Sequence, residues 1–119
     1  MVRPRSYVTD MAHLVELANP GAALPAPAKR LASYLGDIVS AASLFEAGIA
    51  WDSGLRCRRR PGHRPCQETI VFQRSAESRE IHWWCPSGHE EGVIRNWEGT
   101  PWDLSRLRED DPREGALPH

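Results

Sequence analysis

The stretch that decides the fold runs from residue 57 to residue 89, because its two ends, CRRRPGHRPC (57–66) and CPSGH (85–89), hold all three cysteines of the chain. Structural zinc sites use four thiolate or imidazole ligands in a tetrahedron. Cys57 and Cys66 form a C-x8-C pair, and 18 residues separate Cys66 from Cys85. That separation is long enough for a hairpin to leave a site and return to it. The spacing therefore predicts a metal site at the base of a small β-ribbon.

The fourth ligand is the open question in this pattern. In CPSGH, Gly88 stands where a zinc knuckle of the form C-P-x-C-G carries its second cysteine. His89 follows directly and gives a C-x3-H arrangement, so we rank it first. His63 lies between Cys57 and Cys66 and is the alternative fourth ligand. His82 ranks last, because strand alternation turns it away from Cys85.

The expected metal site therefore consists of Cys57, Cys66, Cys85 and His89, with zinc as the metal. The alternative is a metal-free ribbon in which the three cysteines pack as small apolar residues. Three protein ligands with an open position would make a catalytic zinc, and Glu90 and Glu91 are close enough in sequence to serve it. We expect no catalytic residues, because the deaminase pattern H-x-E with C-x-x-C is absent.

Hydrophobic periodicity predicts an α+β fold with N-terminal helices packed on a small antiparallel three-stranded zinc-ribbon-like sheet. Residues 1–8 look extended, and 19–27 form a proline-rich loop. Helices are expected over 11–18, with Thr9 or Asp10 as N-cap, and over 27–47, with Gly48 as the C′ residue. The candidate strands are 49–56, 68–74, 80–85 and 93–97. We expect one domain over 1–104, helical over 1–48 and zinc-ribbon-like over 49–104, followed by a flexible acidic tail over 105–119.

Residues 57–104 resemble the zinc-ribbon-like domain of a family of small uncharacterised bacterial proteins. The resemblance rests on CRRRPGHRPC (57–66), WCP (84–86) and GVIRNWEGTPWDL (92–104), and YVTD (7–10) also fits the layout. It implies that Cys57, Cys66 and Cys85 are metal ligands and that a fourth cysteine belongs at position 88. It implies no biochemical activity.

The loop between the first two cysteines is strongly basic. Arg58, Arg59, Arg60 and Arg64 have no acidic residue among them, although the whole chain has a net charge of −1. Arginines on a loop pinned at both ends are suited to phosphate contacts, and exposed tryptophans could stack on unpaired bases. We therefore predict nucleic-acid contact through residues 56–64. The alternatives are a solvated loop with tryptophans that fill the core, and a protein-interaction module of unknown role.

Several other classes of protein are disfavoured by the sequence. There is no run of apolar residues long enough to span a membrane, and no apolar segment follows the N-terminal arginines as a secretory signal would require. A cytoplasmic protein with reduced cysteines is the expectation. No phosphate-binding glycine loop or nucleophile elbow is present. We expect a binding or adaptor protein, with nucleic acid or another protein as the candidate partner.

Overall fold

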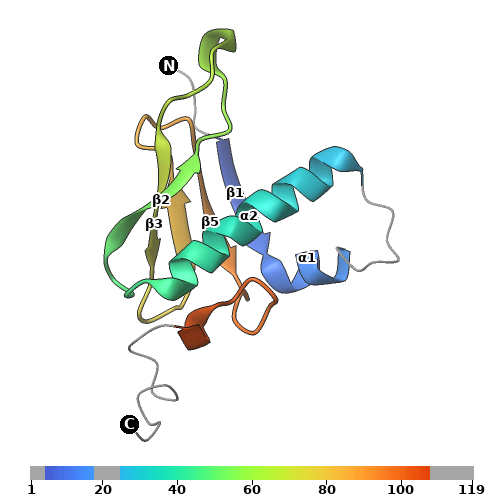
Figure 1. Ribbon diagram of the computed structural model, residues 1–119, viewed down its shortest axis with the longest axis vertical. Helices are drawn as coiled ribbons and strands as arrows, with labels where there is room; N and C mark the ends of the chain where they lie inside the picture. The colour runs from blue at the N-terminus through green and yellow to red at the C-terminus, as the bar shows by residue number, and fades with distance from the viewer. Residues whose placement is uncertain (1–4, 18–24, 108–119) are drawn as a thin grey trace, which may run out of the picture.

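The computed structural model describes residues 5–17 and 25–107. A five-stranded mixed sheet forms one layer, and a long helix lies across it (Figure 1). The elements in chain order are β1 (Arg5–Asp10), α1 (Met11–Leu17), α2 (Ala26–Leu44), β2 (Ala50–Arg56), the 3-10 turn η1 (Pro61–His63), β3 (Thr69–Arg74), β4 (Ile81–Trp84), β5 (Glu90–Arg95) and the 3-10 turn η2 (Ser105–Leu107).

The sheet differs from the predicted three-stranded antiparallel ribbon. Its strand order is β1-β5-β4-β3-β2, so β2 to β5 form an antiparallel meander and β1 joins its far edge. Strand β1 runs parallel to β5, with Arg5 opposite Glu90 and Asp10 opposite Arg95. The predicted extended segment, residues 1–8, is confirmed over 5–8, and residues 1–4 lie outside the described residues. The pairing partner of this strand is 85 residues away, and no local pattern indicates it. The segment before residue 49 is therefore not purely helical.

Helix α2 forms the main wall of the core, as its apolar spacing predicts. It begins at Ala26, with Pro27 in its first turn, and ends at Leu44. The predicted end at residue 47 was too late, because the backbone of Phe45 is already extended. The Phe45 ring instead packs 4.9 Å from that of Trp51 and 5.8 Å from that of Phe72, measured between centroids. Gly48 serves the turn into β2 rather than the end of the helix.

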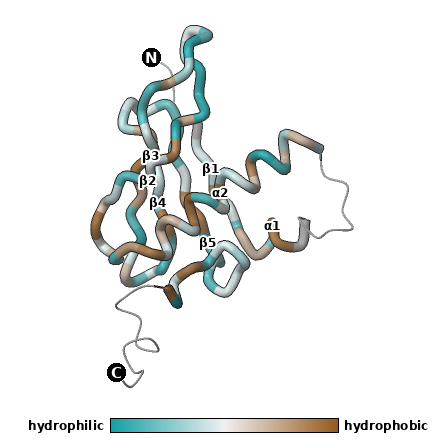
Figure 2. The backbone as a smooth tube through the Cα atoms, viewed as in Figure 1, coloured by the Kyte–Doolittle hydropathy of each residue, from teal (hydrophilic) through white to brown (hydrophobic). Residues whose placement is uncertain are grey.

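The two faces of the sheet have different roles. Tyr7, Gly92, Trp83, Phe72 and Trp51 are paired in a single row across all five strands. This row belongs to the face under α2, where Trp83 and Phe72 are fully buried. In Figure 2, hydrophobic segments alternate with hydrophilic ones along the sheet and α2, whereas the loop at the top of the view, which follows β2, is mostly hydrophilic. Alternation places His82 and Trp84 on the opposite face.

Short-range hydrogen bonds set the start of α1. The Asp10 side chain accepts hydrogen bonds from the backbone N–H groups of Ala12 and His13, which makes it the helix cap. Asp10 also accepts a hydrogen bond from the Asn96 amide, 3.0 Å away, and so ties the helix start to the end of β5. In the described part of the chain, no helix has both the length and the apolar character needed to cross a membrane. The expected 19–27 loop and acidic tail lie largely outside the described residues.

Candidate metal centre

Four ligand-type side chains converge at one end of the sheet. The sulfur atoms of Cys57, Cys66 and Cys85 and a ring nitrogen of His89 all lie within 4.8 Å of one another. The Cys66 and Cys85 sulfurs are 3.7 Å apart, and His89 Nδ1 is 3.1 Å from the Cys66 sulfur and 3.8 Å from the Cys85 sulfur. The three thiols are buried and not linked by disulfides. The predicted clustering of these four residues is confirmed.

Backbone hydrogen bonds hold the three cysteines in place. The N–H of Cys57, directly after β2, donates to the Glu68 carbonyl, and the N–H of Cys66 donates to the Arg59 carbonyl, each over 2.9 Å. The loop between these two cysteines is therefore closed at its base. The N–H of Cys85, directly after β4, donates to the Glu90 carbonyl over 2.8 Å. The end of β4, which carries Cys85, thus lies next to the base of the loop between Cys57 and Cys66.

Gly88 explains how the histidine reaches the cluster. The Gly88 N–H donates to the Cys85 carbonyl over 2.8 Å and closes a tight turn, in which Gly88 adopts a φ of +77°. This left-handed conformation favours glycine. A Cβ atom built on Gly88 would have no neighbour within 4 Å, so the space around it is open. The turn brings the His89 ring to the cluster.

The spacing of the four atoms fits a tetrahedral zinc ion. Zinc–sulfur bonds of about 2.3 Å and zinc–nitrogen bonds of about 2.0–2.1 Å give tetrahedron edges of about 3.8 Å between two sulfurs and about 3.6 Å between sulfur and nitrogen. The observed 3.7 Å and 3.8 Å separations match these edges. The 3.1 Å and 4.8 Å extremes require shifts of only about 1 Å or less. The donor set, three sulfurs and one nitrogen, is also one that zinc favours.

A buried carboxylate borders the cluster and was not predicted as part of it. Glu90 is only 2% exposed, and its Oε1 lies 3.8 Å from the Cys57 sulfur. That oxygen also accepts hydrogen bonds from the Tyr34 hydroxyl and the Arg58 N–H, each over 3.4 Å. Alternation along β5, which buries positions 90, 92 and 94, was the available signal. Nothing in the sequence indicated why a charged residue should be buried at position 90.

The surroundings of Cys57 oppose its ionisation in the metal-free protein. Burial, the neighbouring Cys85 and the charge of Glu90 raise the pKa of Cys57 to about 12, against a contribution from the Arg59 N–H that lowers it. Burial and the Glu90 charge likewise raise the pKa of Tyr34 well above its ordinary value. A metal ion binds the thiolate form, so metal binding at Cys57 must release a proton.

The other two candidate histidines lie outside the group. His63 is exposed on η1, at the tip of the loop. His82 is exposed on the sheet face opposite α2, opposite Gln73 in β3 and Val93 in β5. Its ring lies 5.0 Å from that of Trp84. The ranking of His89 over His63 and His82 agrees with this geometry.

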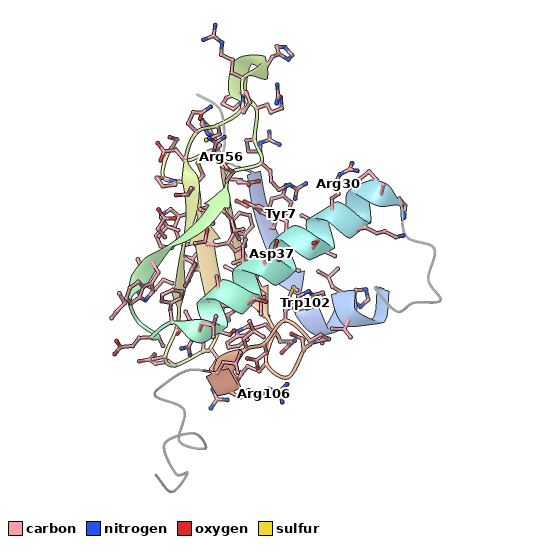
Figure 3. The ribbon with its side chains drawn as sticks, in the orientation of Figure 1. Tyr7, Arg30, Asp37, Arg56, Trp102 and Arg106 are labelled. Carbon is pink, nitrogen blue, oxygen red and sulfur yellow. The ribbon has the colours of Figure 1, made fainter. Side chains whose placement is uncertain are left out.

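The basic loop extends beyond the end of the sheet, above Arg56 (Figure 3). The Arg58 guanidinium lies 5.0 Å over the Tyr34 ring, and Arg60 donates to the His63 carbonyl. Within residues 5–17 and 25–107, no carboxylate forms a salt bridge with any arginine of this loop. Their positive charge is therefore not neutralised by those neighbours. Whether nucleic acid binds there stays a prediction.

The tryptophans are mainly structural. Trp83 and Trp97 are buried, and Trp97 donates from Nε1 to the Arg79 carbonyl over 2.6 Å. Trp102 packs against Gly36, whose missing side chain leaves room for the ring. Trp84 is only partly buried, on the sheet face opposite Trp83. The core-filling interpretation is therefore correct for most of them.

No protein-family model, curated protein or solved structure matches this chain. The resemblance to a zinc-ribbon-like family stays a prediction for that reason.

Proposed function

We propose that the protein is a small binding module in which a structural zinc ion, held by Cys57, Cys66, Cys85 and His89, fixes a basic loop that contacts nucleic acid. The observation that carries the proposal is the convergence of the four ligand atoms within 4.8 Å. Three cysteines and one histidine from three separate chain segments meet there: Cys57 and Cys85 directly follow strands, a backbone hydrogen bond across the basic loop holds Cys66, and His89 follows a tight turn.

The proposed role of the metal is structural rather than catalytic. Four protein ligands complete a tetrahedral zinc site and leave no open position for water or substrate. When bound, zinc would supply cross-links between the base of the 57–66 loop and the turn between β4 and β5. A chain of 119 residues has a small core, so such a cross-link is a substantial addition to its stability.

The proposed partner follows from the charge of the loop. Fixing both ends of residues 58–65 lowers the backbone entropy that this loop loses when its four arginines bind phosphates. Guanidinium groups bind phosphate oxygens with paired hydrogen bonds. The absence of salt bridges to these arginines in the described ranges supports their availability.

Metal analysis of the purified protein tests the structural half of the proposal. We expect one zinc ion per chain, and loss of both zinc and thermal stability in Cys57→Ser and Cys85→Ser. The control is Ser53→Ala, in a strand residue outside the cluster, which should retain one zinc. Absence of stoichiometric zinc, with no stability loss in either cysteine variant, would refute the proposed structural zinc site.

Salt-dependent binding to a single-stranded DNA oligonucleotide tests the nucleic-acid half. Four phosphate contacts predict a slope of about −2.8 in a plot of log affinity against log salt concentration, because counterions are released. Each of Arg58, Arg59, Arg60 and Arg64, changed singly to Gln, should reduce the slope by about 0.7. Arg30→Gln, on the exposed part of α2, is the matched control and should leave it unchanged. Binding that is absent or independent of salt would refute this half.

A further inference from the structure

A cavity lies between the basic loop and the turn that carries His89. Its volume is about 480 Å³, within the range of small-ligand pockets. The loop contributes Arg59 and Arg60 to its lining, and the turn contributes Ser87 and His89. The walls are thus the two segments that the metal centre joins.

The residues that line the cavity include basic and hydroxyl-bearing ones. Two arginines and Ser87 are among them, and none of the lining residues is acidic. Gly62 and Gly88 add backbone without side chains, which leaves space for a ligand to approach the main chain. A lining with two full positive charges and no negative one favours a compact anion.

The metal ligand His89 supplies a further donor. Its Nδ1 faces the Cys66 sulfur at 3.1 Å, so Nε2 is the nitrogen left for a partner outside the cluster. No described residue fills that role through a hydrogen bond. When Nδ1 binds a metal, Nε2 carries the proton and becomes a donor, and ligands of this kind almost always have a second partner. The cavity is where an acceptor can meet it.

We propose that this cavity binds a phosphate monoester: the terminal phosphate of a nucleic-acid strand or the phosphate of a free mononucleotide. A monoester ends in three oxygen atoms and carries up to two negative charges, which suits two arginines, a hydroxyl and an imidazole N–H. An internal phosphodiester has chain on both sides, whereas a small cavity between two loops is better suited to a chain end. This inference rests on the proposed nucleic-acid function, because it names the group that the loop recognises.

The test uses the purified, metal-loaded protein and two DNA oligonucleotides of one sequence, with a 5′-phosphate or a 5′-hydroxyl, plus a third with a 3′-phosphate. We expect one of the phosphorylated ends to bind at least about tenfold more tightly than the hydroxyl end, as added hydrogen bonds to a charged group imply. Arg60→Gln and Ser87→Ala should reduce that preference. Arg64→Gln, in the same loop but not part of the lining, should weaken all three oligonucleotides equally and preserve it.

The outcomes separate this inference from the function on which it rests. Equal affinity for all three oligonucleotides would overturn the phosphate pocket and leave nucleic-acid contact standing. If none of them binds near physiological salt, nucleic-acid contact fails, and titration with adenosine monophosphate and inorganic phosphate decides the pocket alone. Saturable binding of either ligand that Arg60→Gln abolishes would support the pocket, and no binding would overturn it.

Discussion

Replacing Gly88 with cysteine is the sharpest test of how the metal centre is built. By sequence pattern, Gly88→Cys restores the fourth cysteine of a zinc knuckle and should strengthen metal binding. The structure predicts no such gain, because the left-handed backbone at position 88 disfavours any side chain and His89 already provides a fourth ligand-type atom. The two lines of reasoning predict opposite results.

The magnitude follows from the backbone. Gly88 has a φ of +77°, and a residue with a side chain pays about 1–2 kcal/mol to adopt the left-handed conformation. We expect the free energy of unfolding of the zinc-loaded Gly88→Cys protein to fall by that amount. If the turn relaxes when zinc leaves, the zinc affinity falls by roughly 5–30-fold, because the strain is then confined to the bound state.

The assay combines chelator competition for zinc with visible spectroscopy of the cobalt-substituted protein, which is sensitive to the number of sulfur ligands. The cobalt spectrum of Gly88→Cys should match that of the original protein. Gly99→Cys is the matched control, since Gly99 also has a φ of +77° and open space at its Cβ, but lies outside the cluster. It should lose similar stability with no change in zinc affinity.

Testing Gly88→Cys in a variant that lacks His89 shows directly whether position 88 can supply a ligand. His89→Ala should weaken zinc binding strongly, and adding Gly88→Cys should not restore it. The reasoning is refuted if the double variant binds zinc as tightly as the original protein, with a cobalt spectrum that gains a sulfur ligand.

Three further predictions follow from the fold. Gly92→Ala would place a Cβ atom 2.6 Å from the ring of the fully buried Trp83. We therefore expect the free energy of unfolding, measured by chemical denaturation, to fall by about 1–3 kcal/mol. Gly36→Ala is the comparison and should lower it less, because it meets the partly exposed Trp102 and gains helix propensity. Stripping zinc with a chelator should lower the melting temperature. The loss is equivalent to about 2.7 kcal/mol when the starting concentration of free zinc is about 100 times the dissociation constant. An unchanged melting curve would contradict a structural metal. The hydrogen bond from Asn96, with those from two backbone N–H groups, lowers the pKa of Asp10 below 3.8. The ionised Asp10 therefore stabilises the fold above that pH, and this stabilisation is lost as the pH falls through the lowered pKa. Asp10→Asn should flatten this part of the acid-unfolding curve.

The sequence predicts those parts of the molecule whose cause is local. The 3–4 spacing of Leu35, Ile38 and Val39 predicts α2, and the alternation in 69–74 and 81–84 predicts β3 and β4, because burial of one face fixes each pattern. The metal cluster is predictable for a different reason. Few residue types bind zinc, and their spacing limits how they can meet.

Other features depend on contacts that no local pattern records. Strand β5 was expected at 93–97 but lies at Glu90–Arg95, because a glutamate and Gly92 occupy core-facing positions where apolar residues are expected. Glu90 was expected near the metal site only because it follows His89 in sequence. Its burial beside Cys57 was not predicted, because charged residues are rarely buried. The pairing of β1 with β5 depends on which sheet edge remains free after the meander forms.

That pairing has a consequence for the order of folding during synthesis. Strand β1 is made first, yet its partner β5 leaves the ribosome about 85 residues later, so the nascent chain holds an unpaired strand throughout. Closing so long a loop is slow compared with forming hairpins. The meander can assemble as each hairpin appears, and the same late segment brings in both Cys85 and His89 immediately before β5. The proposed metal site and the sheet therefore become complete at the same stage of synthesis. Until then the unpaired strand is the point at which the chain is most open to pairing with the wrong partner.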